Sequence, residues 1–234
     1  MDNYENLDAI AVRDTVDRLQ ARISARFPTR NLQSVAGELS EAITELTINP
    51  RSPWYRTMQF LSRILVILVG VVALSGIVFL VVGAVAAAGP EPWEWASFVE
   101  TIINDVVFAG VAVFFLWQIP KRVQRAHDLE SLHRLRSLAH VIDMHQLTKD
   151  PDRLSTGYVK TSESIDLDMD MHELWGYLDY CSEMLSLVGK AGALFAEQNN
   201  DDVVLATVEG IEDLTTGMSR KIWQKIALLK DGQA

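Results

Sequence analysis

Two acidic residues at the start of an apolar stretch are the residues in this chain most suited to chemistry. Glu100, Asn104 and Asp105 stand where the mostly apolar residues 102–119 begin. Acidic side chains within membrane spans are costly and often mark ion pathways. In a homo-oligomer these residues would form polar rings at the outer mouth of a cation-selective pore. If the span begins later, Asp105 lies at the outer membrane interface instead, and both interpretations stay open.

Histidines on a predicted helix offer a second kind of chemistry. His133, His140 and Asp143 recur at spacings that place them on one helical face. Imidazole and carboxylate groups are ligands for divalent transition metals, so this face is a candidate metal site. The alternative is a polar helix face with ordinary ion pairs. The acidic run 166–170 lacks the glycine and the closing glutamate of an EF-hand, which excludes that calcium loop.

Motifs of other classes are missing from the sequence. It contains no phosphate-binding glycine loop, no Gly-x-Ser-x-Gly elbow and no zinc-protease His-Glu pattern. The single cysteine, Cys181, excludes an internal disulfide and a multi-cysteine metal cluster. A net charge of -10 argues against nucleic acid as the main partner. We therefore expect neither an enzyme nor a bound cofactor.

An uninterrupted apolar stretch indicates a membrane protein. No ionisable side chain occurs in residues 64–88, and about 20 apolar residues suffice for a helix to cross the bilayer. A second span is predicted at about residues 102–119, ending at Pro120, and the helical pattern of residues 123–147 is expected to continue it. The connection, residues 89–101, contains prolines, tryptophans and acids. The two spans therefore predict a transmembrane hairpin over residues 51–120, with the lipid bilayer as a partner.

The charges around the hairpin predict its orientation. Basic residues lie before the first span and after the second, and the acids Glu91, Glu94 and Glu100 lie in the segment that connects the spans. Because positive charge stays on the cytoplasmic side, both termini are expected in the cytoplasm. The amino terminus lacks the basic start and apolar stretch of a secretory or organelle-targeting segment. We expect an uncleaved integral protein of a bacterial inner membrane.

Small residues indicate how the spans pack. In lipid, helices associate through small-residue faces that allow close approach. The candidates are Ala73, Gly76, Gly83 and Ala87 in the first span and Gly110 in the second. This seam serves either packing within the hairpin or contact between protomers.

The remaining sequence predicts a cytoplasmic helical bundle. Apolar residues recur at three- and four-residue spacing over residues 7–27, 32–46, 123–147, 172–198 and 202–230. No segment predicts strand pairing. The expected fold is all-α, with N-terminal cytoplasmic helices in residues 1–50, the hairpin, and a C-terminal cytoplasmic helical region in residues 121–234.

In architecture the chain resembles other two-span proteins with both termini inside, such as mitochondrial calcium uniporters and two-helix membrane effectors of bacterial antiviral systems. Uniporters carry a Trp-Asp-x-x-Glu-Pro element before the second span. Here the segment reads WEWASFVETIIND, which shares aromatics and acids but not the motif. No functional residue is carried over from either comparison.

Two functions fit these features. The first is a homo-oligomeric cation channel whose wall is the spans and whose outer mouth carries Glu100 and Asp105. The second is a non-conducting signalling or effector scaffold, anchored by the hairpin and acting through its bundle. The large share of the chain outside the hairpin favours the scaffold. The channel is the preferred prediction, because an acid such as Asp105 within the membrane region needs a functional reason.

Overall fold

A computed structural model describes residues 7–48, 53–86, 95–154, 157–164 and 166–231. Within these ranges the chain is helical and no strand occurs, which confirms the all-α prediction. The elements are α1 (Ala9–Arg26), α2 (Leu32–Ile48), α3 (Pro53–Ala86), α4 (Trp95–Leu147), the 3-10 turn η1 (Pro151–Leu154), α5 (Met171–Gln198) and α6 (Asp202–Asp231).

The chain divides into two compact units. One comprises residues 1–50 and 128–234, and we call it the bundle. The other comprises residues 51–127, which contain α3 and the first part of α4, and we call it the apolar unit. The boundary between the units falls inside α4, so one helix contributes to both.

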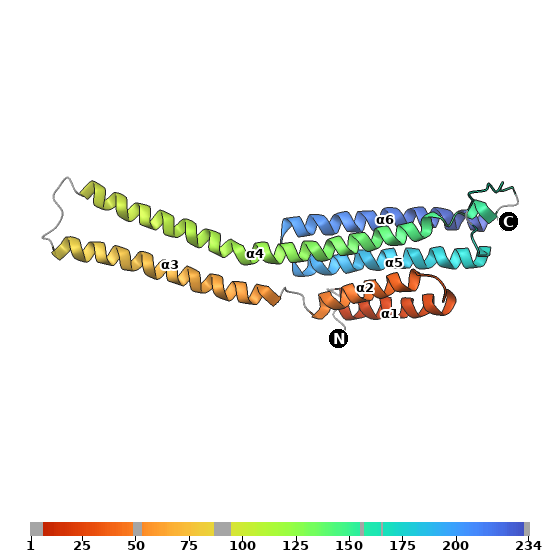
Figure 1. The fold of residues 1–234 in the computed structure, drawn as a ribbon, viewed down its shortest axis with the longest axis horizontal. Coiled ribbons are helices and arrows are strands. Elements are labelled where there is room, and N and C mark those ends of the chain that lie inside the picture. The colour runs from red at the N-terminus through yellow and green to blue at the C-terminus, as the bar shows by residue number, and fades with distance from the viewer. Residues whose placement is uncertain (1–6, 49–52, 87–94, 155–156, 165, 232–234) are drawn as a thin grey trace. The chain divides into compact units, whose positions relative to one another are not determined.

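The bundle is held together by the apolar stripes that the sequence predicts. The helices α1 and α2 form a short hairpin, and α5 and α6 form a longer one (Figure 1). Helix α5 also packs on α1. Predicted core residues from every helix are fully buried, among them Val16, Leu39, Ile142, Leu178 and Ile222. Burial of this kind contributes about 1.5–3 kcal/mol per large aliphatic side chain.

Polar side chains fix where the bundle helices begin. Asp8 accepts a hydrogen bond from the backbone N–H of Ile10 at the start of α1. Asp170 and Glu173 form a reciprocal capping box at the start of α5. Such caps satisfy backbone N–H groups that lack a partner within the helix. The positive end of the helix dipole also stabilises the negative charge of the carboxylates.

The apolar unit has little interior of its own. In α3 and α4 the most apolar 18-residue windows contain no residue that is buried within the chain. Phe79 is 79% exposed, Val85 74% and Trp117 71%. Both helices are long and apolar enough to cross a membrane.

The start of α4 differs from expectation, and its continuation does not. Residues 95–101 were predicted as part of the loop, but they are helical, and α4 begins at Trp95. The rest of the predicted loop, residues 89–94, lies outside the described part of the chain. At the other end, α4 runs past Pro120 to Leu147, which confirms the prediction that the helix over residues 123–147 continues the second span. Proline lacks only one donor, so α4 continues after losing the hydrogen bond to the Leu116 carbonyl.

Close contact between α5 and α6 leads to a first prediction. A Cβ at Gly189 would lie 3.1 Å from Thr215 Oγ1, whereas a Cβ at Gly217 would meet no atom within 4 Å. Gly189→Leu should therefore overpack this contact and lower the free energy of unfolding by about 1–3 kcal/mol. The measurement is urea denaturation in mild detergent. Gly217→Leu, the control, should be neutral or stabilising by up to about 1 kcal/mol. Equal effects of the two variants would contradict this packing.

Candidate functional site

The three predicted pore residues all lie in the first turns of α4. Glu100 and Asn104 are exposed and one helical turn apart, so they share a face. Asp105 is half-buried and lies about 100° further round the helix than Asn104. The two acids therefore do not project in the same direction from α4. Their role at a pore mouth stays a prediction.

Among the described residues, the glycines of the predicted packing seam have open space beside them. A Cβ at Gly76, Gly83 or Gly110 would meet no atom within 4 Å. Ala73 is half-buried, and Ala87 lies outside the described residues. The choice between packing within the hairpin and contact between protomers is therefore still open.

The candidate metal ligands are on the bundle part of α4. His133 and His140 are exposed, and Asp143 accepts a hydrogen bond of 2.7 Å from Gln146 Nε2. In the described ranges, no group of three His, Cys, Asp or Glu side chains is arranged to hold a metal ion. The structure does not bring these three residues together as a site.

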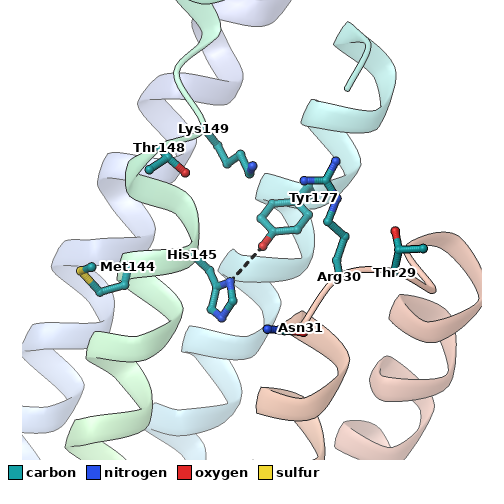
Figure 2. Close-up of a pocket in the computed structure, with 8 residues that line it drawn as sticks. All are labelled: Thr29, Arg30, Asn31, Met144, His145, Thr148, Lys149 and Tyr177. Carbon is teal, nitrogen blue, oxygen red and sulfur yellow. Dashed lines mark hydrogen bonds between the residues drawn. The ribbon is translucent and has the colours of Figure 1, made fainter. Parts of the chain in front are cut away.

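A polar cavity in the bundle is a candidate site. It has a volume of about 320 Å³ and lies where the α1–α2 turn meets the end of α4 and the side of α5. Figure 2 shows its lining, which consists of Thr29, Arg30, Asn31, Met144, His145, Thr148, Lys149 and Tyr177. We call it the turn cavity. A volume near 300 Å³ is at the lower end of the range for small-molecule sites.

Two cations give the turn cavity its charge. Arg30 donates a hydrogen bond of 2.8 Å to the carbonyl oxygen of Asp168 and lies 3.6 Å from that residue's carboxylate. The ammonium of Lys149 lies 5.7 Å from the centre of the Tyr177 ring. Burial lowers the pKa of Lys149, and the positive charges of Arg30 and Arg153 lower it further. The cavity therefore gathers positive charge at some electrostatic cost.

A tyrosine and a histidine complete the cavity wall. Tyr177 is buried, and its hydroxyl lies 3.3 Å from His145 Nδ1 (Figure 2). Burial raises the pKa of the Tyr177 phenol, so the phenol stays protonated. Its hydroxyl can therefore donate a hydrogen bond to Nδ1. With Tyr177 as donor, the neutral imidazole carries its own proton on Nε2.

No protein-family model matches the chain. No curated protein and no solved structure matches it either. Its function therefore has to be argued from its own residues and their geometry.

Sequence reasoning did not single out the turn cavity. Arg30 follows Pro28 in a turn, and Lys149 follows the last residue of α4, so neither belongs to a helical stripe. Residues that end neighbouring helices are the ones that meet at one end of a bundle. The sequence does show basic residues near two helix ends, and this is its only indication of the cavity. It does not show which helix ends lie together in the fold.

His145 gives a second prediction, on pH. Burial and then the charge of Lys149 lower the pKa of His145 in the folded chain from 6.5. As pH falls through about 6.5 the unfolded chain takes up a proton that the folded chain resists, so stability falls. Urea titration of the full chain in detergent should show this loss between about pH 7 and 5. His145→Gln should reduce it, whereas His140→Gln, at an exposed position of α4, should not. An unchanged pH profile in His145→Gln would contradict the assignment.

Proposed function

We propose that the chain is an integral membrane protein whose hairpin of α3 and α4 anchors a signalling or effector bundle. The observation that carries the proposal is the exposed apolar surface of these two helices. In the most apolar part of each helix, no residue is buried within the chain. Water would disfavour so large an exposed apolar surface, whereas hydrocarbon would not. The helical geometry also satisfies the backbone hydrogen bonds that lipid cannot.

Flanking charges support an orientation for this hairpin. Lys121, Arg122 and Arg125 follow the apolar stretch of α4, and Arg56 and Arg63 lie in the first turns of α3. By the positive-inside rule both ends of the chain are then cytoplasmic, in a bacterial inner membrane. The bundle, with its closed core and polar cavity, is then the part exposed to the cytoplasm.

A homo-oligomeric cation channel is the second candidate. It is favoured by Asp105, which lies in α4 among apolar residues and needs a polar neighbour in lipid. The open faces of Gly76 and Gly110 would allow protomers to approach closely. Because two helices cannot enclose a pore, this function requires several copies of the chain.

Ion flux through full-length protein in liposomes separates the two functions. The anchor predicts no flux of monovalent or divalent cations above that of empty liposomes. Flux that is reduced in Asp105→Asn and Glu100→Gln would overturn the anchor in favour of the channel. Flux that is equal in wild type and both variants would also overturn the anchor, and would remove the role given to the acids.

A further inference from the structure

We propose that the turn cavity binds an oxyanion of the phosphate class, held between Arg30 and Lys149. The inference goes beyond membrane anchoring and does not depend on it, because binding can be measured in detergent. It rests on three observations: the positive charge of the cavity, the contacts that its two cations make, and the hydrogen-bond donors that line it.

Charge in the turn cavity is unbalanced. Its eight lining residues include Arg30 and Lys149 but no aspartate or glutamate. Like charges that gather in a partly buried place raise each other's free energy. Burial is the main cause that lowers the pKa of Lys149, and the positive charges of Arg30 and Arg153 lower it further. A bound anion would relieve this repulsion, since opposite charge favours the protonated form of Lys149.

The nearest carboxylate, that of Asp168, offsets the charge of the site only in part: it raises the pKa of Lys149, but burial, Arg30 and Arg153 lower that pKa by more. Asp168 does not line the cavity, and its side chain is 93% exposed. An ion pair of 3.6 Å with so exposed a partner contributes little, whereas the Arg30 side chain is itself only 25% exposed. Asp168 has a positive φ of 46°. Its carbonyl accepts from Arg30, and this contact orients the guanidinium without using all five of its donors.

A neighbouring lysine is already engaged elsewhere. Lys225 of α6 donates to the backbone carbonyls of Gln146 and Lys149 and to the Gln146 side chain. No comparable acceptor for the Lys149 ammonium occurs within the described residues; its close neighbour is the face of the Tyr177 ring. The Lys149 head group thus remains able to bind a ligand.

Neutral donors surround the two cations. Thr29, Asn31 and Thr148 line the cavity, and the Nε2–H of His145 is available when Nδ1 accepts from Tyr177. A planar guanidinium, a point-charge ammonium and several hydroxyl or amide donors match the oxygen shell of a phosphate group. A cavity of about 320 Å³ leaves room for the group esterified to it, so a phosphate monoester is the expected ligand.

Such a monoester can be a soluble metabolite or a lipid headgroup, and two arms of one experiment separate them. In the first arm, calorimetry measures binding of glycerol 3-phosphate to the full chain in mild detergent. In the second, the probe is phosphatidic acid in nanodiscs, compared with nanodiscs of phosphatidylcholine alone. Binding in the first arm indicates a soluble ligand, and preference for phosphatidic acid in the second alone indicates a headgroup.

Arg30→Gln and Lys149→Gln should each weaken binding about tenfold or more in the arm that shows it, because each removes a charge-assisted hydrogen bond. Arg134→Gln is the matched control. It removes one positive charge from α4 at a site that pairs with Glu41 and Glu45, and it should leave binding unchanged. Lys149→Arg, which keeps the charge, should retain binding even if a glutamine variant misfolds. Absence of binding in both arms, or equal weakening by Arg134→Gln, would overturn the proposal.

Discussion

Replacing Leu74 and Val78 of α3 together with arginine should release the chain from membranes. Both side chains are exposed and lie in the middle of the apolar stretch, 63% and 51% accessible within the chain. Each arginine at the centre of a span costs roughly 2.5–3.5 kcal/mol on insertion, and the favourable terms of leucine and valine are lost as well. The double change is therefore the largest single disturbance of the anchor. The measurement is the fraction of protein retained in membranes after alkaline extraction.

A matched control introduces the same two arginines into the bundle instead of α3. Val203 and Leu228 of α6 are apolar and exposed to a similar degree, 46% and 58%. The double variant Val203→Arg and Leu228→Arg should stay in the membrane fraction like wild type, because these residues belong to the bundle. Retention of the α3 variant at the wild-type level would contradict the role of α3 as a span.

Leu178→Ala should destabilise the bundle by about 2–5 kcal/mol. Leu178 is fully buried in α5, the helix that packs on both α6 and α1. Truncating it removes apolar contact from the centre of the bundle and leaves a cavity, and the neighbouring helices can collapse only in part. Urea denaturation in mild detergent, followed by circular dichroism, measures the loss.

Leu228→Ala provides the comparison for this variant. Leu228 is exposed on α6, so its truncation should change the free energy of unfolding by less than about 0.5 kcal/mol. If Leu178→Ala and Leu228→Ala had the same effect, the core described for the bundle would be wrong.

Much of the fold was predictable because helical periodicity reports burial directly. The predicted stripe Val12, Val16, Leu19 and Ile23 of α1 is buried throughout. Predicted helices over residues 172–198 and 202–230 match α5 and α6 to within one residue, and the turn at Asn199 separates them. An apolar face every three or four residues has only one simple explanation, a helix with one side in a core.

Other features depend on contacts that no local pattern carries. The Asp128 carboxylate, nearly fully buried, accepts a hydrogen bond of 2.9 Å from Asn199, 71 residues later. Arg30 and Lys149 meet in the turn cavity only because their helices end at the same place.

The acidic residues of α4 show a third kind of limit. Residue spacing places Glu100 and Asn104 on one face and Asp105 on another, which a regular helix fixes. In the proposed hairpin or channel, lipid and other copies of the chain would surround these side chains. Their chemistry is therefore a matter for flux measurements and not for the geometry of one chain.

Cysteine labelling tests the central claim, a hairpin anchor with the bundle in the cytoplasm, most directly. Native Cys181 is fully buried and can stay in place. Ala25, Ser97 and Thr216 are exposed positions in α1, near the start of α4 and in α6, and each is changed to cysteine in turn. Spheroplasts of a bacterial host are then treated with a membrane-impermeant maleimide.

The account predicts that the Ser97→Cys variant reacts in intact spheroplasts, whereas the Ala25→Cys and Thr216→Cys variants react only after the membrane is permeabilised. Reaction of either bundle variant in intact spheroplasts, or protection of Ser97→Cys until permeabilisation, would contradict it.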